Sequence, residues 1–236
     1  MIQIGTCKVK AMKHCGTQRI ETKRLVLRKF SVDDAEAMFR NWASDPEVTK
    51  YLTWPAHANI EVSRALLQDW VSAYSQKNYY QWAIVLKEQG DEPIGSISAV
   101  EWNDDIAMAE IGYCIGRAWW RRGITSEALQ AVMDFFFDQV EANRIQCRHD
   151  PRNPHSGMVM KKCGMKYEGT MRSSDKNNQG VCDACCYHSK SAGFTRRFTA
   201  NPVGVSPNLG RFLWIHRICS ASACTCRKTW SGRLIA

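Results

Sequence analysis

The sequence predicts a mixed α/β domain, of the α+β kind, in which helices punctuate a mostly antiparallel, twisted sheet. Two periodicities carry this prediction. Between residues 24 and 187, short runs alternate apolar and polar residues, and longer runs repeat their apolar residues at helical spacing. A third observation is composition: 44% of the 236 residues are hydrophobic, with 9 Trp and 8 Phe. That much apolar material suffices for a core and excludes a chain that is disordered throughout.

In the first half, alternation predicts the strands and capping residues predict the helices. Ser31, followed three residues later by Asp34, predicts a capping box that opens a helix running to Trp42. Asn59 is expected to cap a second helix over residues 60–74. The expected strands are residues 24–30, 80–87, 93–102 and 109–115.

The second half begins with a strongly apolar helix and continues with shorter elements. Residues 125–140 form the expected helix, and its apolar residues fall on one face. A shorter helix over residues 154–163 is expected to end at Gly164. The expected strands are residues 144–149, residues 165–172 and one near residues 181–187, with a polar loop over residues 173–180.

The formal net charge of +9 is unevenly distributed along the chain. Residues 188–236 contain eight basic and no acidic residues, whereas residues 1–187 carry 24 basic and 23 acidic residues, a net charge of +1. Periodicity also ends near residue 187, and Pro and Gly interrupt the stretch that follows. We therefore expect an N-terminal extension over residues 1–18, one domain over residues 19–190, and an irregular basic tail over residues 191–236.

The basic tail has two interpretations. Its basic residues are interleaved with aromatic ones, which is typical of segments that bind nucleic acid through charge and stacking. The alternative is translation in a shifted reading frame from about residue 185, because acidic residues and periodicity disappear together inside a predicted strand. Such a shift would truncate the strand expected near residues 181–187.

Neither a membrane span nor a metal site is expected. No run approaches 18 apolar residues, and the N-terminus lacks the continuous apolar segment of a secretory signal. A cytoplasmic location is therefore expected, where the 11 Cys would be free thiols. Cys182, Cys185 and Cys186 do not form the paired CxxC motifs of a zinc ribbon, so no metal is expected.

One segment, residues 110–129, joins a predicted strand to the helix that follows it. The strand ends at Ile115, a loop with Arg121, Arg122 and Gly123 follows, and the helix begins near Thr125. Backbone N–H groups in such a loop and the positive end of the helix dipole both favour an anion, so the layout indicates a pyrophosphate site. The alternative is an ordinary β–α turn with two solvated arginines.

Several motifs, spaced independently over residues 19–187, point to one family. They are ETKRLVLR at residues 21–28, EIGY at 110–113 followed by Trp119 with Trp120 and GITSEAL at 123–129, RHDPRNPHSGMV at 148–159, and KCGMKYEG at 162–169. Together they resemble the GCN5-related N-acetyltransferase (GNAT) family, and within it the RimJ/RimL-type ribosomal-protein alanine N-acetyltransferases.

The resemblance implies the GNAT fold and an N-acetyltransferase reaction with acetyl-CoA as co-substrate and no metal. In that reaction a substrate amine attacks the thioester directly, without a covalent acyl-enzyme. The acceptor implied is a protein N-terminal amine, such as that of a ribosomal protein, or a small-molecule amine, and both a monomer and a homodimer are compatible. An alternative is an inactive GNAT body that associates with RNA or the ribosome through its basic tail.

The resemblance also implies roles for particular residues. Ser156 takes the place of the acid that protonates the leaving thiolate, Asp175 matches a general base, and Glu110 is the alternate base. The implied acetyl-CoA contacts are Cys114 and Ile115, through backbone groups, Trp120, Arg121, Arg122, Gly123, Ile124, Thr125, Ser126, and Asn153, which contacts the pantetheine arm. Two departures from the family pattern are Arg121 in place of a usual Gly and Thr125 in place of the Gly or Ala nearest the phosphates.

Each catalytic assignment has a structural alternative. Ser156 would suit the first turn of a helix, Asp175 a solvated turn, and Glu110 the edge of a strand. Asn153, just before Pro154, would suit a helix cap. His149, in a strand beside a carboxylate, is expected to be a packed structural residue rather than a base.

Overall fold

The computed structural model describes residues 10–190, so the basic tail over residues 191–236 lies outside the described residues. The strands are β1 (Ile20–Glu21), β2 (Leu25–Arg28), β3 (Gln81–Leu86), β4 (Pro93–Asn103), β5 (Met108–Ile115), β6 (Arg144–His149), β7 (Lys166–Asn177) and β8 (Gly180–Lys190). The helices are α1 (Ala35–Met38), α2 (Pro46–Thr49), α3 (Ile60–Ala73), α4 (Ile124–Asp138) and α5 (Pro154–Lys162). A 3-10 turn (Val32–Asp34) leads into α1, and a π-helical segment (Phe39–Ala43) extends it.

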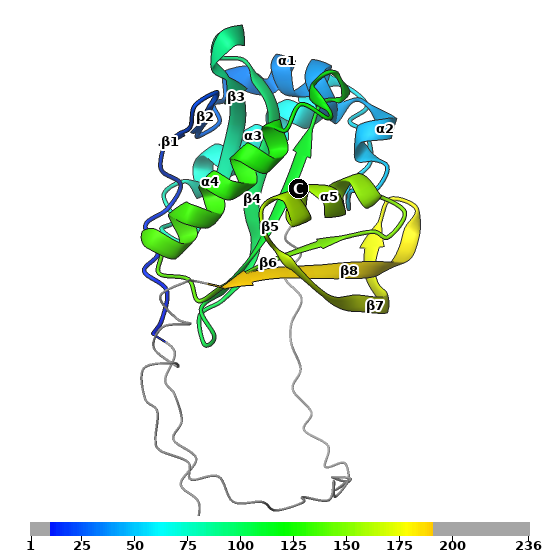
Figure 1. Cartoon of the computed structure of the whole chain (residues 1–236). Helices are drawn as coiled ribbons and strands as arrows, with labels where there is room; N and C mark the ends of the chain where they lie inside the picture. Colours follow the sequence, from blue (N-terminus) through cyan, green and yellow to red (C-terminus); the bar gives the residue numbers. More distant parts are fainter. Residues whose placement is uncertain (1–9, 191–236) are drawn as a thin grey trace, which may run out of the picture.

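All eight strands form one sheet in the order β1-β2-β3-β4-β5-β6-β8-β7 (Figure 1). Every neighbouring pair is antiparallel except β5 and β6, which run parallel. A parallel pair needs a crossover connection, and α4 supplies it between these two strands. The mostly antiparallel mixed sheet flanked by helices confirms the predicted fold class.

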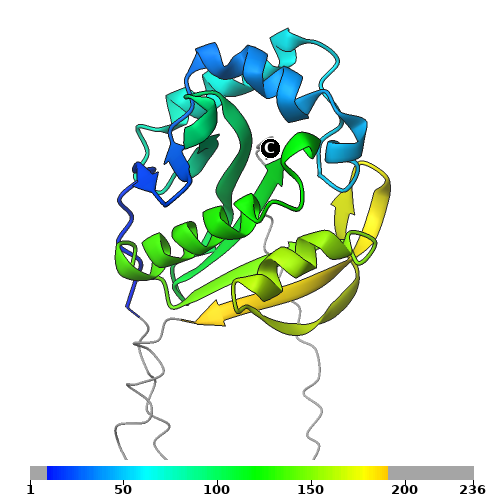
Figure 2. The same cartoon turned by 45° about the horizontal axis from the view of Figure 1, so that its top comes forward.

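Helices cover the two faces of the sheet unequally (Figure 2). On one face, α4 and α5 pack over a main core that draws apolar residues from β2 through β6. On the other face, α1, its π-helical extension and α3 pack over a second core with residues of β2, β3 and β5 only. No residue of β6, β7 or β8 belongs to that second core, so this part of the sheet is packed on one side.

The capping residues that were predicted to begin the first two helical segments do so. The Ser31 backbone N–H donates to the Asp34 carboxylate at 2.8 Å, as in a capping box. The Asn59 carbonyl oxygen accepts from the Val62 N–H at 3.2 Å and so caps α3. Helix formation at these places is therefore specified by local hydrogen bonding.

Residues 10–18, which the sequence placed in an N-terminal extension, lie against the domain where the structure describes them. The Met12 side chain is buried in the main core. The Lys13 N–H donates to the Val140 carbonyl at 2.7 Å, and the Thr17 hydroxyl donates to the Tyr79 carbonyl at 3.0 Å. These contacts attach the segment to α4 and to the start of β3.

One sequence expectation near the C-terminal end is wrong, and the truncated last strand that one interpretation of the tail implied is not seen. The polar segment 173–180 is not a loop, because β7 continues through it to Asn177 and only a short turn remains before β8. The last strand is not truncated near residue 185, because β8 pairs with β6 as far as Lys190. Both strands form through backbone ladders, and a hairpin exposed to solvent needs few apolar side chains.

Over residues 10–190, no helix is long and apolar enough to cross a membrane.

Candidate active site

The parallel strands β5 and β6 pair only over their first three residues. Their register joins Met108–Glu110 to Arg144–Gln146, after which β5 continues to Ile115 and β6 to His149 without pairing to each other. We call the two diverging stretches, residues 111–115 and 147–149, the wedge. Backbone groups of β5 that face β6 are thereby left unused by the sheet.

The chain that leaves β5 forms a donor-lined turn before α4. Arg121 and Gly123 adopt left-handed backbone conformations with φ of 61° and 73°, and α4 begins at Ile124. No backbone carbonyl of residues 10–190 accepts a hydrogen bond from the N–H groups of residues 121–126. Free N–H donors at the positive end of a 15-residue helix fit a phosphate group.

Gly123 allows close approach at the start of this helix. A Cβ atom built on Gly123 would lie 3.1 Å from the Lys162 ammonium nitrogen of α5. Arg24 stands on the same side, since its guanidinium donates to the Arg122 carbonyl at 3.1 Å and to Glu127 at 2.6 Å. The turn is therefore bordered by Arg24, just before β2, and by Lys162 of α5, as well as by its own arginines. The sequence had singled out neither Arg24 nor Lys162, because both are distant from the turn along the chain.

Some side chains of residues 121–126 are exposed to solvent, and others are buried in the core. Ile124 and Ser126 are buried, whereas Arg121 and Arg122 are exposed and Thr125 is half-buried. Any phosphate contact from Ile124 or Ser126 would therefore come from the backbone. Arg121 adopts a left-handed backbone conformation although it is not Gly. For a residue with a Cβ atom, this conformation raises the free energy of the folded state by about 1 kcal/mol.

The end of β5 is fastened by Trp120. Its indole N–H donates to the Ile115 carbonyl at 2.8 Å, which folds the ring back toward the strand. The Cys114 thiol lies 3.3 Å from the Ser96 hydroxyl of β4. Burial raises the pKa of the Cys114 thiol, so this thiol remains protonated and unreactive.

The two candidate bases lie together on the sheet face opposite α4 and α5. Glu110 is buried, and its carboxylate accepts from Arg148 at 2.7 Å and from Gln146 at 2.8 Å. The Asp175 carboxylate, on β7, lies 3.8 Å from the same Arg148 guanidinium. The Asp175 side chain is 36% exposed against 6% for Glu110, so Asp175 is the more accessible carboxylate.

The sequence analysis named Glu110 and Asp175 as candidate bases only because of the family resemblance. It assigned no role to Arg148, which contacts both carboxylates. Asp175 belongs to β7, opposite Cys182, rather than to a turn. Alternating side-chain direction in β6 places Gln146 and Arg148 on one face, which a reading of that strand could have shown.

Ser156 lies in the first turn of α5, across the wedge from β5. The Tyr113 phenol of β5 donates to the Ser156 backbone carbonyl at 3.0 Å and lies 3.1 Å from its hydroxyl oxygen. Burial raises the pKa of Tyr113 well above its ordinary value. Ser156 is therefore held toward β5 by a neutral phenol that the sequence had not singled out.

Asn153 and His149 flank the entrance to α5. The Asn153 side chain makes no capping hydrogen bond although the residue occupies the N-cap position, so its amide is not used to cap the helix. His149 donates from Nδ1 to the Asp150 carbonyl at 2.8 Å, and its ring packs 5.7 Å from that of Tyr187. A Cβ built on Gly157 would lie 2.6 Å from His149 Nε2, so that nitrogen faces a packed helix backbone. His149 is placed as a structural residue.

The turn between β7 and β8 is tied to the loop that follows α2. The Asn178 N–H donates to the Leu52 carbonyl at 2.9 Å. Its side-chain amide donates to the Thr49 carbonyl at 2.6 Å and to the Trp54 carbonyl at 2.9 Å. These hydrogen bonds join the β7–β8 turn to the end of α2 and the loop after it, and Asn178 and Thr49 are 129 residues apart in the sequence.

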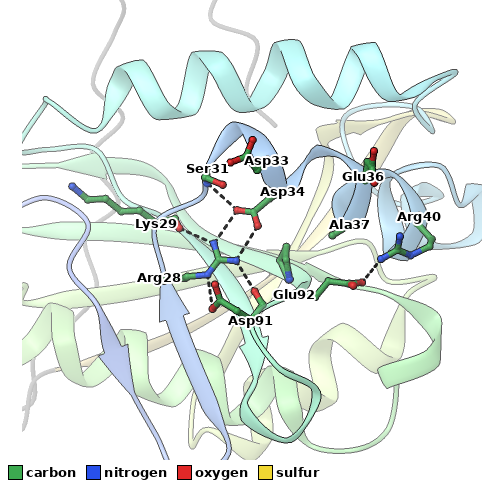
Figure 3. Close-up of a pocket in the computed structure, with 11 residues that line it drawn as sticks. Arg28, Lys29, Ser31, Asp33, Asp34, Glu36, Ala37, Arg40, Asp91 and Glu92 are labelled. Carbon is green, nitrogen blue, oxygen red and sulfur yellow. Dashed lines mark hydrogen bonds and ion pairs between the residues drawn. The ribbon is translucent and has the colours of Figure 1, made fainter.

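A separate hollow of about 700 Å³ lies where α1 meets the β3–β4 turn (Figure 3). Its central pair is Arg28 and Asp34, joined by hydrogen bonds of 2.8 and 2.9 Å, and Arg28 also donates to Asp91 at 3.0 Å. None of the predicted site residues lines it. Arg28 and Arg40 are both paired with carboxylates in this hollow, and the Arg28–Asp34 pair anchors the start of the first helical segment.

Within the part of the chain that the structure describes, no group of three His, Cys, Asp or Glu side chains is placed to hold a metal ion.

The architecture and the diverging strands are those of an acyltransferase. A family model described as an acetyltransferase (GNAT) domain matches residues 24–166. The uncharacterized N-acetyltransferase p20 of Bacillus licheniformis is 34% identical over 168 residues, covering 70% of this chain and 92% of that protein. The chain belongs to the GNAT family and is an N-acetyltransferase.

Further similarities support this placement. The ribosomal-protein-serine acetyltransferase of Escherichia coli is 32% identical over 139 residues, covering 58% of this chain and 75% of that protein. A GNAT-family acetyltransferase from Bacillus anthracis superposes with a TM-score of 0.64 at 25% identity, covering 74% of this chain and 99% of that one. The RimL ribosomal-protein acetyltransferase, solved with coenzyme A, has the same fold, with a TM-score of 0.65 at 20% identity over 73% of this chain and 98% of its own.

Proposed function

We propose that this protein transfers an acetyl group from acetyl-CoA to a primary amine by direct attack of the amine on the thioester. One observation carries the proposal: β5 separates from β6 after residue 110, and the chain that leaves β5 forms a turn with free N–H donors that opens a 15-residue helix. The divergence and the donors lie on one continuous segment, residues 111–126, so a molecule with an acyl group at one end and phosphates at the other can span both. The RimL structure that shares this fold is a complex with coenzyme A, which agrees with this co-substrate.

Different residues of this chain would bind different parts of acetyl-CoA. N–H donors of residues 121–126 would hold the phosphates, with Arg121 and Arg122 adding positive charge. The uncommitted amide of Asn153 would contact the pantetheine arm, and backbone groups of Cys114 in the wedge would orient the thioester. The acetyl-CoA thioester supplies the activated acyl group; the protein supplies position and proton handling.

Proton handling would use the groups on either side of the wedge. Asp175, the more exposed of the two carboxylates, would take the proton of the attacking amine, directly or through water, with Glu110 as the alternate base. Ser156 would donate its hydroxyl hydrogen to the leaving sulfur and would regain a proton from solvent, while the amine proton leaves through the base. The raised pKa of the buried Cys114 thiol argues against a cysteinyl acyl-enzyme and so favours direct attack.

The acceptor we favour is a protein N-terminal α-amine, with a small-molecule amine as the other candidate. An α-amine has a pKa of about 7.7–8.0 against about 10.4 for lysine, so a weak base suffices to deprotonate it. The E. coli relative is named for a ribosomal protein, which agrees with a protein acceptor. The inactive, RNA- or ribosome-binding alternative depends on residues 191–236, and the comparisons lend it no support.

Release of coenzyme A thiol tests this function. Purified protein with acetyl-CoA and a panel of N-terminal peptides and small amines is expected to release thiol in proportion to acetylated product. Ser156→Ala is expected to lower kcat about 100-fold at saturating acetyl-CoA, because a positioned general acid contributes on that order. Unchanged turnover in Ser156→Ala would remove Ser156 from the mechanism, and absence of acetylated product with every acceptor would count against the function.

A further inference from the structure

Tyr113 is the side chain that fixes the hydroxyl of Ser156. Its phenol oxygen lies 3.1 Å from Ser156 Oγ and 3.0 Å from the Ser156 carbonyl oxygen. Among residues 10–190, no other side chain makes a hydrogen bond with Ser156 Oγ. Tyr113 stands on β5 within the wedge, and its ring packs against the main core between β5 and α5.

The number of available protons limits how this pair can be arranged. A phenol has one proton, and a backbone carbonyl can only accept. When the Tyr113 proton points to the Ser156 carbonyl, the Ser156 hydroxyl hydrogen is directed to the phenol oxygen. Rotation of the phenol O–H onto Ser156 Oγ reverses the second bond and frees the Ser156 hydrogen. Both arrangements use the same heavy atoms at the same distances.

We propose that Tyr113 is a positioning residue for acetyl transfer, whose hydroxyl turns from the Ser156 carbonyl to Ser156 Oγ and thereby directs the Ser156 hydrogen into the wedge. The inference rests on the proposed role of Ser156 as the donor to the leaving sulfur. In the turned arrangement, Ser156 Oγ accepts from Tyr113 while donating its own hydrogen, so the hydroxyl stays fixed during donation.

The surroundings of Tyr113 suit a positioning role better than a proton-donating one. Burial raises its pKa well above the ordinary value, so it stays a neutral phenol that can both donate and accept. Its hydroxyl is directed to Ser156 through two contacts, so Tyr113 acts through that residue. Because the ring is held in the core on a β-strand, only the hydroxyl hydrogen needs to move.

The test compares Tyr113→Phe with a matched variant at a second partly buried tyrosine. Tyr113→Phe keeps the ring and removes both hydrogen bonds. Tyr74→Phe likewise removes two, since the Tyr74 hydroxyl accepts from the Phe30 N–H and donates to the Gln81 carbonyl, each at 2.9 Å. Tyr74 lies at the end of α3, outside the wedge. Thermal unfolding checks that both variants are folded at the assay temperature.

We expect Tyr113→Phe to lower kcat about tenfold while KM for acetyl-CoA changes less than about twofold, since alignment and not binding is lost. Tyr74→Phe is expected to lower Tm with kcat unchanged. The double variant Tyr113→Phe/Ser156→Ala is expected to match Ser156→Ala alone, because Tyr113 acts through Ser156.

The outcomes separate this inference from the proposed function. A wild-type protein that transfers no acetyl group contradicts the function itself. If the wild type is active and Tyr113→Phe leaves kcat unchanged, the role of Tyr113 alone is overturned. The same holds if the fold-decrease in kcat of the double variant equals the product of the two single fold-decreases. A kcat loss in Tyr74→Phe equal to that in Tyr113→Phe would assign both effects to general core damage, which also overturns it.

Discussion

The strands β3 and β7 belong to one sheet but differ in how far their side chains are buried. All six residues of β3 are buried, because helices pack on both faces of that part of the sheet. Of the 12 residues of β7, Asn177 alone is buried. β3 is therefore held by side-chain packing, whereas β7 is held mainly by backbone pairing to β8 and has mostly exposed side chains.

The proposed active site lies at the boundary between these two regions. Glu110 and Tyr113 come from β5, the last strand that contributes to both cores. Arg148 and Asp175 come from the side packed on one face only. A rigid strand on one side and an open polar face on the other is the arrangement that a reaction with an entering amine requires.

The largest expected effect tests the packing difference directly. Trp82→Ala in β3 is expected to lower the free energy of unfolding by about 3–5 kcal/mol, because the fully buried indole packs against Tyr80 and Phe135 and leaves a cavity. Met171→Ala in β7, whose side chain is 44% exposed, is expected to cost less than about 0.5 kcal/mol. Urea unfolding of both variants makes the measurement, and similar losses would contradict the contrast.

A smaller effect is expected at the turn before α4, where two glycines form a matched pair. Gly123 and Gly164 share a φ of 73°, but a Cβ on Gly164 meets nothing within 4 Å, whereas one on Gly123 approaches Lys162. Each change to Ala is expected to cost about 1 kcal/mol of stability from backbone strain.

Only Gly123→Ala should also raise KM for acetyl-CoA, because only that Cβ enters the proposed phosphate site. Steady-state kinetics of the two variants measure the difference. An equal change in KM would place the phosphate site elsewhere.

The smallest expected effect concerns pH and the loop after α2. His57 lies 2.7 Å from the Ser63 hydroxyl, and burial lowers its pKa from the ordinary value near 6.5. In the pH range just below 6.5 the unfolded chain therefore binds more protons at His57 than the folded chain. The free energy of unfolding should fall as pH decreases through this range, and His57→Gln should reduce that slope. Urea unfolding at several pH values measures it, and a slope that persists in full would assign the effect to other groups.

Much of the fold was predictable because its signals are local. The Ser31–Asp34 capping box, the Asn59 cap and the strand alternation of residues 80–87 depend on neighbours in the chain. The second part of β7, after residue 172, and the end of β8 were not predictable in this way. Their conformation comes from pairing with strands elsewhere in the sequence, and residues 173–177 carry polar side chains typical of turns.

Some parts of the candidate site were likewise predictable from neighbouring residues, and others were not. The turn over residues 116–124 is continuous in sequence, so its glycine, its arginines and the following helix could be interpreted together. The Arg148 contacts with Glu110 and Asp175, and the Tyr113 contact with Ser156, join residues that are 27 to 43 positions apart. No spacing rule connects such residues before the sheet is assembled.

The amino-acid sequence by itself determined the class of fold, the position of the turn before α4 and the family to which the chain belongs, because each depends on local patterns or on motifs contiguous in the chain. The tertiary structure decided which carboxylates share Arg148, which phenol holds Ser156, and where β5 and β6 part. Those relations depend on strand register and on the crossover through α4, which bring distant residues within hydrogen-bonding distance only once the sheet has formed.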